Sequence, residues 1–418
     1  MNFFIFFLCN LPLINAYNDI NLTGNINYNN EFVLKTNLLQ NYKPDLIPIY
    51  NNSVDLKLGI ALRAFNNINQ IDGTITSNIW LRYKWTDPYL KWNSTETNIS
   101  SIIFNTSPDY NNHIWTPDIY LYNTAEMPMS NLDKTKCIVY SDGVVLWSRP
   151  GLITSTCTFN LEKFPYDEQD CTFKFGSWAY HSGQMNLSKG EPDIDLSNYQ
   201  INDAWDIISH NSQINEKNYL CCPEKYQTIN FNFKIRRKPG YYNLNIIIPT
   251  FATATLMIMS LMVPWDSGER ISFSITVMLS IIVFLLILSE NLPKSDNKPL
   301  LSIMLIGLIF FSLFVVFFTV IISYMHSFTE NKSKTALKIV KFLKKYKCIK
   351  CKTQNHNHNH NQNTLENNRT DSYNNVINNR IEEDCKQVAN FMENIFTIIF
   401  LVSFIIYCIV VFSLRPNY

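Results

Sequence analysis

Residues 271–288 of the chain are ISFSITVMLSIIVFLLIL, eighteen consecutive residues without a charge. A stretch of this length can cross the ~30 Å hydrocarbon core of a bilayer as an α-helix. Glu269 precedes the stretch and Glu290 follows it. Three other stretches have the same apolar character. We therefore predict four membrane spans: Tyr242–Val263, Ile271–Leu288, Leu300–Tyr324 and Phe391–Leu414.

The segments outside these spans indicate their orientation. Phe3–Leu13 is a short apolar run that resembles a secretory signal, cleaved after Ala16. Lys332–Lys352 carries nine lysines, which the positive-inside rule places in the cytoplasm. Both ends of the mature chain are then extracellular, as the signal requires. The predicted parts are a signal peptide (1–16), an extracellular domain (17–240), three spans (241–325), a cytoplasmic linker (326–388) and a fourth span with a short extracellular C-terminus (389–418).

The extracellular part has the pattern of a β protein. Apolar side chains alternate with others along Val54–Leu62 and again along Ile229–Ile235. A period of two is typical of half-buried strands, so we predict a β-sandwich. Glu31–Asn41 is predicted to be one amphipathic helix before the strands. The expected fold class is an all-β extracellular sandwich with an N-terminal helix, followed by a four-helix transmembrane bundle.

Composition excludes several classes of function. Lys plus Arg is 35 and Asp plus Glu is 34, a net charge of +1, which argues against a nucleic-acid binder. The extracellular part shows no nucleophile–base pairing, metal cluster or phosphate loop, so an enzyme is disfavoured and no cofactor or metal is predicted.

Cysteines mark two places in the extracellular part. Cys157 and Cys171 enclose thirteen residues, in a compartment where disulfides persist. A closed loop of this size is worth about 3 kcal/mol in the chain-entropy model. Cys221 and Cys222 are adjacent, so a bond between them is strained and suggests a functional turn, the alternative being two unrelated thiols. Cys137 is left over and is predicted to be a buried free thiol.

Asn-x-Ser/Thr sequons are consistent with secretion, although they arise by chance in an Asn-rich chain. The glycosylation candidates are Asn21, Asn51, Asn93, Asn98, Asn105 and Asn186.

The cytoplasmic linker has one further motif, Cys348-Ile-Lys-Cys351, followed by a His-Asn tract. Zinc binding, palmitoylation and no special role all remain open for these two cysteines. The middle of the linker is predicted to be disordered.

Several motifs in order resemble one family, the pentameric Cys-loop ligand-gated channels, and within it the nicotinic acetylcholine receptor α-type subunits. The Cys157–Cys171 segment has the family spacing and its Phe-Pro-x-Asp core. The other matching segments are Trp80-Leu-Arg-Tyr-Lys-Trp-Thr-Asp, Trp115-Thr-Pro-Asp-Ile-Tyr-Leu-Tyr-Asn, Gly176-Ser-Trp-Ala-Tyr, Tyr219-Leu-Cys-Cys-Pro-Glu-Lys-Tyr226 and Asp266-Ser-Gly-Glu-Arg-Ile-Ser. The resemblance implies five subunits around a central pore, in a homo- or hetero-pentamer.

The resemblance also implies an agonist site for acetylcholine or a related quaternary amine. A quaternary ammonium cannot donate a conventional hydrogen bond, so it is bound by aromatic faces. The principal face is expected to hold Tyr122, Trp178, Tyr219, Cys221, Cys222 and Tyr226, and the complementary face of the neighbouring subunit to hold Trp80. Trp80 alternates with Arg82 and Lys84 on a polar face, which is unusual for a core tryptophan. Tyr219 and Tyr226 are predicted to lie in a polar loop outside any strand.

The second span carries the expected pore chemistry. One helical face is polar at its cytoplasmic end, apolar in its middle and bounded by acids. Its residues are Glu269, Ser272, Thr276, Leu279, Val283 and Glu290. In a pentamer the acids would form negative rings that attract cations. Monovalent cations are the expected ions, and permeation of calcium stays open. Leu279 matches the family's hydrophobic gate. Arg270, adjacent to Glu269, is expected from the resemblance to point away from the lumen.

Asp167, Arg237 and Pro293 match residues that couple agonist binding to the pore in the family. The leading hypothesis is thus an acetylcholine-gated cation channel subunit in the plasma membrane, with a postsynaptic location implied by the family. Gating by another amine such as choline, an accessory role beside a conducting partner, and a multi-pass binding protein that does not conduct are the alternatives.

Overall fold

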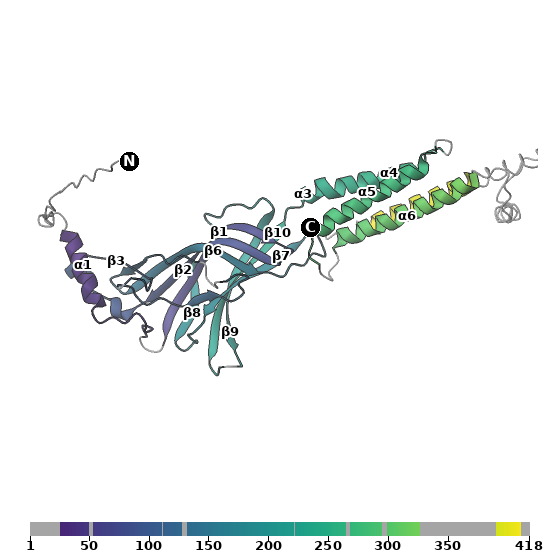
Figure 1. The fold of residues 1–418 in the computed structure, drawn as a ribbon. Coiled ribbons are helices and arrows are strands. Elements are labelled where there is room, and N and C mark those ends of the chain that lie inside the picture. The colour runs from purple at the N-terminus through teal and green to yellow at the C-terminus, as the bar shows by residue number, and fades with distance from the viewer. Residues whose placement is uncertain are drawn as a thin grey trace, which may run out of the picture.

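The computed structural model describes residues 26–49, 53–110, 112–127, 132–220, 222–264, 268–294, 299–326 and 390–410. Figure 1 shows an elongated molecule, with helix α1 (Ile26–Leu39) at one end, two β-sheets in the middle and long helices at the other end. The predicted signal peptide, the cytoplasmic linker with Cys348 and Cys351, and the last residues of the chain lie outside the described residues.

Two sheets form the predicted sandwich. Their strand orders are β3-β5-β6-β2-β1-β8 and β4-β7-β10-β9. The six strands of the first sheet are β1 (Val54–Asn69), β2 (Thr74–Thr86), β3 (Ser101–Phe104), β5 (Cys137–Tyr140), β6 (Val144–Thr156) and β8 (Met185–Asp195). The four strands of the second are β4 (Ile119–Leu121), β7 (Glu168–Ser177), β9 (Trp205–Asn218) and β10 (Lys225–Arg237). Short helices η1 (Pro88–Leu90) and α2 (Ser94–Thr97) connect β2 to β3.

The predicted alternation is confirmed in both sheets. On β1 the residues Val54, Leu56, Leu58, Ile60 and Leu62 are all buried, and on β10 so are Ile229, Phe231, Phe233 and Ile235. They belong to one apolar core between the sheets. A one-residue register shift would turn this whole set to solvent, so the pattern determines which face of each strand is inside.

The N-terminal helix differs from the prediction. It begins and ends earlier than Glu31–Asn41, at Ile26 and Leu39. Leu34, Leu38 and Leu39 are half-buried and pack against the core, whereas Phe32 and Val33 are exposed, so the helix is amphipathic, as predicted. The helix ends in a turn in which Tyr42 N donates to Leu39 O.

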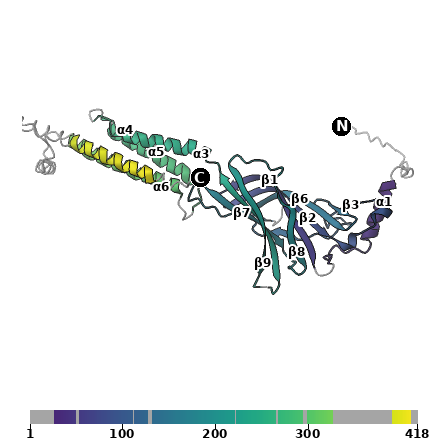
Figure 2. The same ribbon diagram turned by 180° about the vertical axis from the view of Figure 1, so that it is seen from behind.

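The four predicted spans are helices of sufficient length and apolarity to cross a membrane. The first, Gly240–Ser260, contains α3 (Gly240–Tyr242), a π-helical turn (Asn243–Ile247) and α4 (Ile248–Ser260). Pro249 lies just after the π turn and has no N–H to donate, which accounts for the irregular hydrogen bonding there. The other spans are α5 (Arg270–Glu290), α6 (Leu300–His326) and the helix at Asn390–Val410, yellow in Figure 2.

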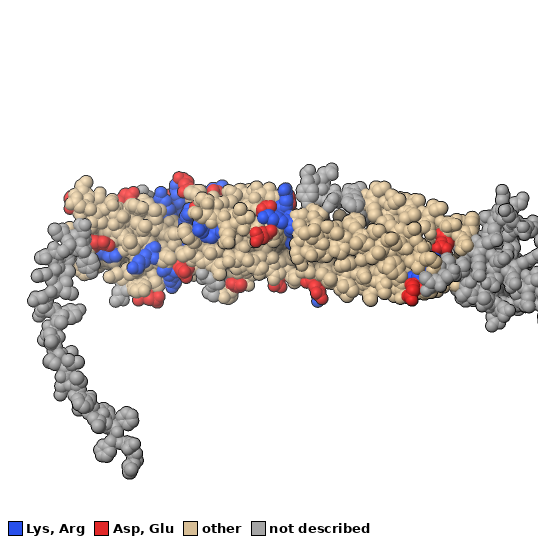
Figure 3. All heavy atoms as spheres, turned by 90° about the horizontal axis from the view of Figure 1, so that it is seen from above, with Lys and Arg blue, Asp and Glu red and all other residues tan. Residues whose placement is uncertain are grey.

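Surface charge separates the two halves of the molecule. Figure 3 shows acidic and basic side chains over the sandwich, whereas the helical half is nearly free of them except at its far end. Uncharged outer helix surfaces are what a lipid environment requires.

The fourth helix packs on α6 through aromatic rings, including Phe311 against Phe400 and Phe318 against Phe396.

Candidate functional site

Four aromatic side chains from separate segments lie, as two pairs, at one end of the four-stranded sheet. Tyr122 follows β4, and its ring centroid lies 6.4 Å from that of Trp178, which follows β7. Tyr219 follows β9 and lies 5.8 Å from Tyr226 on β10. Burial, with smaller contributions from Tyr219, Asp118 and Tyr226, raises the pKa of Tyr122 to about 12, so its hydroxyl stays protonated at neutral pH. We call these four residues the aromatic cluster.

Trp178 is the open part of the aromatic cluster, with 64% of its surface exposed. A tryptophan this exposed makes little contribution to a core and presents a large π face to solvent. The ring centroid of Tyr120 lies 6.5 Å from that of Trp178.

Asp118 holds the segment that carries Trp178. Its carboxylate accepts hydrogen bonds from Ser177 Oγ at 2.5 Å and from Ala179 N at 2.7 Å, and its carbonyl accepts from Trp178 N at 3.3 Å. Burial raises the pKa of Asp118. Asp118 was not among the predicted site residues, which were aromatic residues and a cysteine pair. The signal that points to it is the Asp of the Trp-Thr-Pro-Asp motif.

Close packing also holds Tyr122 in place. Its hydroxyl donates to Ser177 O. Gly176 lies beneath its ring, where an added Cβ would come within 3.1 Å of the ring and 2.9 Å of Thr228. Any larger side chain at Gly176 would displace Tyr122 or Thr228, so the glycine is needed for the close approach.

One expectation about this region is wrong. Tyr219 does lie in a loop, but Tyr226 lies within β10, opposite Lys217 of β9. The turn between β9 and β10 is therefore tighter than its polar composition suggested. Cys222 is disulfide-bonded, and its expected partner Cys221 lies outside the described residues.

Trp80 does not join the aromatic cluster. It lies on β2 in the other sheet, paired with Ala61 of β1 and Pro150 of β6, and 39% of its surface is exposed. The prediction that it faces outward with Arg82 and Lys84 is confirmed. In the described part of the chain it touches none of the four rings, as expected if it serves a neighbouring copy.

A cavity of about 420 Å³ lies on the same outer face as Trp80. Arg82 and Lys84 line it from β2, and Leu146 and Ser148 line it from β6. Arg82 pairs with Asp195 at 2.8 Å, and Lys57 pairs with Glu191 at 3.1 Å. The lining of this cavity is predominantly basic.

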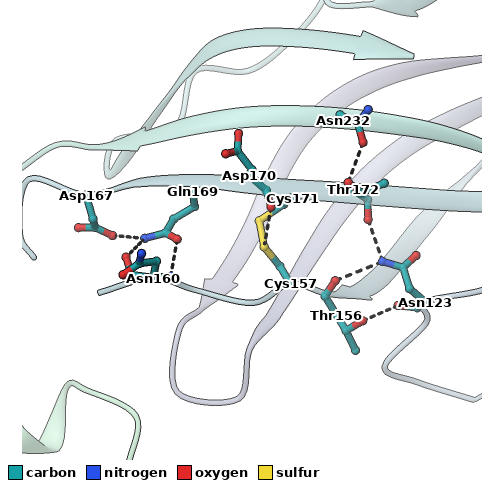
Figure 4. Close-up of a disulfide and its surroundings, with 10 residues drawn as sticks. All are labelled: Asn123, Thr156, Cys157, Asn160, Asp167, Gln169, Asp170, Cys171, Thr172 and Asn232. Atoms are coloured by element: carbon teal, nitrogen blue, oxygen red, sulfur yellow. Dashed lines mark hydrogen bonds between the residues drawn. A yellow bond between two sulfur atoms is a disulfide. The ribbon is translucent and has the colours of Figure 1, made fainter. Parts of the chain in front are cut away.

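The disulfide loop joins the sandwich to the helices. Cys157 and Cys171 are bonded, as predicted, with Cα atoms 5.3 Å apart. Figure 4 shows Gln169 inside the loop, donating to Asn160 O and to Asp167 Oδ2. Leu300 N, at the start of α6, donates to Glu162 O of the loop at 2.9 Å. Cys137 is free and buried, as predicted.

Arg237 and Asp167 form a buried ion pair at this junction. The guanidinium donates to both carboxylate oxygens, at 2.7 and 3.1 Å. It also lies over the rings of Trp205 and Phe164, at 4.2 and 4.9 Å. The predicted coupling residues Asp167 and Arg237 are thus brought together, while Pro293 lies in the loop between α5 and α6.

Gln70, at the β1–β2 turn, extends this network to the helices and was missed by the sequence analysis. Its Oε1 accepts from Arg237 Nη2 at 2.5 Å, and its Nε2 donates to Asn291 O at 2.5 Å. Asn291 follows α5 directly and is two residues before Pro293. A single amide therefore connects the buried arginine to the end of α5.

Helix α5 has two distinct faces. Ser274, Val277, Ile281 and Leu288 are buried against α4 and α6. The residues of the predicted pore face are all exposed: Glu269, Ser272, Thr276, Leu279, Val283 and Glu290. Arg270 is buried and pairs with Glu393 of the fourth helix at 2.6 Å, so it points away from that face, as predicted.

Comparison with known proteins identifies the family. Residues 32–239 match the family model for the neurotransmitter-gated ion-channel ligand binding domain, and residues 246–380 match that for the neurotransmitter-gated ion-channel transmembrane region. The chain belongs to the neurotransmitter-gated ion-channel family. The predicted family and fold class are confirmed, and the family is one of channels and not of enzymes.

Similar members of the family are acetylcholine receptor subunits. The chain is 36% identical over 274 residues to acetylcholine receptor subunit alpha-type acr-16 of Caenorhabditis elegans, covering 65% of this chain and 54% of that protein. It is 36% identical over 282 residues to acetylcholine receptor subunit alpha-like 2 of Drosophila melanogaster (64% and 48%). It is 35% identical over 289 residues to the human neuronal acetylcholine receptor subunit alpha-2 (68% and 53%). The chain spans about half the length of the curated relatives it matches.

Among the sequons, the described structure places Asn93 and Asn98 at exposed positions and Asn105 and Asn186 at half-buried ones. Asn21 and Asn51 lie outside the described residues. Glycosylation at these sites stays a prediction.

Proposed function

We propose that this chain is a subunit of a pentameric cation channel opened by acetylcholine. The aromatic cluster carries the proposal. Tyr122 packs against the exposed Trp178, and Tyr219 packs against Tyr226 at the same end of the sheet. A quaternary ammonium is stabilised by such aromatic faces by about 2 kcal/mol or more when desolvated. The names of its relatives support the choice of acetylcholine.

Trp80 completes the site from the next subunit in this proposal. It lies on the opposite sheet from the aromatic cluster, so a closed ring of subunits would present the Trp80 face of one to the aromatic cluster of another. This arrangement suits a homopentamer or a pentamer with related subunits. The cysteine pair at the tip of the β9–β10 turn, Cys221 and Cys222, would close over the bound agonist.

The pore is assigned to the exposed face of α5. In a ring of five, Glu269 and Glu290 would place negative charge at both ends, and Leu279 would form an apolar constriction between them. Cation selectivity follows from these acids. The network of Asp167, Arg237 and Gln70 would carry movement of the sandwich to the end of α5.

Further expectations follow from the membrane topology. The sandwich (17–240) and the C-terminus would be extracellular, and the linker (326–388) cytoplasmic. A postsynaptic plasma membrane is the location that suits an acetylcholine-gated channel. Gating by choline or another amine is the second candidate, because the aromatic cluster discriminates by charge and size and not by one specific hydrogen bond.

Two-electrode voltage clamp on oocytes that express this chain alone tests the proposal. Acetylcholine should evoke an inward current that reverses near 0 mV, and choline should be compared at equal concentrations. Absence of current together with absence of surface labelling would indicate a missing partner subunit. Surface expression with neither acetylcholine binding nor current would contradict the proposal.

A further inference from the structure

In each half of the proposed agonist site, a basic side chain of the protein already lies over an aromatic ring. On the complementary half, the Arg63 guanidinium lies 4.6 Å from the centroid of the Trp80 ring. On the principal half, Lys217 Nζ lies 5.2 Å from the centroid of Tyr219, and Lys174 Nζ lies 5.8 Å from that of Tyr122. These distances are within the ~6 Å at which a cation is attracted to a ring face.

The strand geometry explains why Arg63 meets Trp80. Ala61 is paired with Trp80 across β1 and β2, and side chains two residues apart on a strand share a face. Arg63 is thus the diagonal neighbour of Trp80, within reach for a long side chain. The register shift between Leu62 and Ala64 leaves Arg63 without a paired residue on β2. The small Ala61 leaves the Trp80 face accessible.

Lys217 reaches Tyr219 in a comparable way. It is paired with Tyr226 across β9 and β10, so both side chains are on the side of the aromatic cluster. The neighbouring Glu216 is on the other side, where it pairs with Lys225 at 3.7 Å. Within the described residues, Arg63 and Lys217 form no ion pair, whereas Arg82 close by is neutralised by Asp195.

We infer that Arg63 and Lys217 occupy the aromatic faces of the unliganded site and that an agonist ammonium must displace them. The inference rests on the proposed function. One face of a ring holds one cation. A ligand that binds there must first break the cation–π attraction between the basic side chain and the ring, so its net binding free energy is smaller by that amount. Arg63 and Lys217 are therefore specificity-determining residues that weaken the binding of small quaternary amines.

The size of the effect follows from ordinary cation–π energies. At an exposed ring this attraction corresponds to about a two- to fivefold change in affinity. Arg63→Gln and Lys217→Gln should each lower the half-effective concentrations of acetylcholine and tetramethylammonium by about this factor. Arg63→Lys, which keeps a cation, should stay close to the parent chain.

Matched controls separate displacement from general charge effects. Lys84→Gln removes one positive charge from the same face as Trp80, and Lys225→Gln removes one from the strand opposite Lys217. Neither lysine lies over a ring of the site, so neither substitution should shift the response. The uncharged isostere 3,3-dimethylbutyl acetate, tested as an inhibitor, should also bind Arg63→Gln more tightly than the parent chain, because any group that takes the Trp80 face must displace Arg63. Simple repulsion between like charges would leave this neutral ligand unaffected.

The experiment uses oocytes that express the full chain, with surface labelling of every variant. Lower half-effective concentrations in Arg63→Gln and Lys217→Gln alone support the inference, as does a response that appears only in these variants. A responding parent chain with unshifted or weakened variants overturns the inference and leaves the proposed function standing. Equal shifts in the control variants, or unchanged binding of the neutral isostere in Arg63→Gln, also overturn it. Silence of the parent chain and of both variants at normal surface levels overturns the inference and the proposed function together.

Discussion

Asp167 of the disulfide loop and Arg237 at the end of β10 form a buried ion pair directly above the helices, with 2.7 Å between Arg237 Nε and Asp167 Oδ1. Aromatic rings lie against the Arg237 guanidinium, so water cannot take the place of Asp167 if that carboxylate is removed. Removing one member of a buried pair costs about 3–5 kcal/mol, because the other charge is left uncompensated.

Arg237→Gln should therefore reduce the number of assembled receptors at the surface and abolish agonist-evoked current. The double variant Asp167→Asn with Arg237→Gln should recover part of the surface level, because no buried charge is left alone. Arg236→Gln is the control, since Arg236 pairs with Glu168 at the exposed surface. Surface biotinylation and voltage clamp measure both quantities. Normal surface levels and currents in Arg237→Gln would contradict the assigned role.

Gln70→Leu should impair gating while preserving assembly. The change removes the hydrogen bonds to Arg237 and to Asn291 O, each worth about 0.5–1.5 kcal/mol. If these bonds are stronger in the open state, their loss should raise the half-effective acetylcholine concentration by about tenfold. Gln213→Leu, at an exposed amide on β9, is the matched control. A Gln70→Leu response equal to that of the control would exclude a coupling role.

Trp178→Ala should weaken the binding of acetylcholine by about thirtyfold or more, because about 2 kcal/mol of cation–π attraction is lost. Trp178→Phe should have a smaller effect, since a smaller π face remains. Tyr110→Ala, at an exposed tyrosine outside the aromatic cluster, should leave the response unchanged. Concentration–response curves measure the shifts. A Trp178→Ala variant with the affinity of the parent chain would place the agonist elsewhere.

Reversal of charge at the ends of α5 should change ion selectivity. Glu290→Lys and Glu269→Arg would replace the proposed negative rings by positive ones and repel cations at close range. The reversal potential in low-sodium solution should then move towards that of chloride, and the single-channel conductance should fall. Glu96→Lys, on the exposed α2, provides the control. Unchanged selectivity in both α5 variants would mean that this face does not line the pore.

Leu279→Ser should destabilise the closed pore. A hydroxyl at an apolar constriction favours wetting, so we expect agonist-independent current. A bias of about 1.4 kcal/mol towards the open state would lower the half-effective acetylcholine concentration by about tenfold. Leu313→Ser, at an exposed leucine of α6, tests whether any polar residue in a span has this effect. Equal behaviour of the two variants would rule out Leu279 as the gate.

Local patterns predicted much of the structure correctly. The buried faces of β1 and β10 and the exposed face of α5 follow from hydrophobic periodicity, since each residue's environment depends on its position along one strand or helix. Two predictions that had no clear periodicity behind them were wrong: the bounds of the N-terminal helix and the position of Tyr226 in a loop. Helix α1 begins at Ile26 and ends at Leu39, so its bounds differ from the predicted ones. Tyr226 is in β10 because its pairing with Lys217 of β9 continues into the segment that was predicted to be a loop.

By itself, the sequence determined the sandwich alternation and the four spans, because these depend on spacing along the chain. The aromatic candidates for the site came from the resemblance of its motifs to one family. Only the tertiary structure decided which distant side chains meet. Gln70 lies 167 residues from Arg237 and 221 residues from Asn291, yet it bonds to both. Arg63 lies on Trp80 because of the register of β1 against β2. Such contacts depend on how strands pair and how the domain sits on the helices, and no periodicity in the chain specifies that.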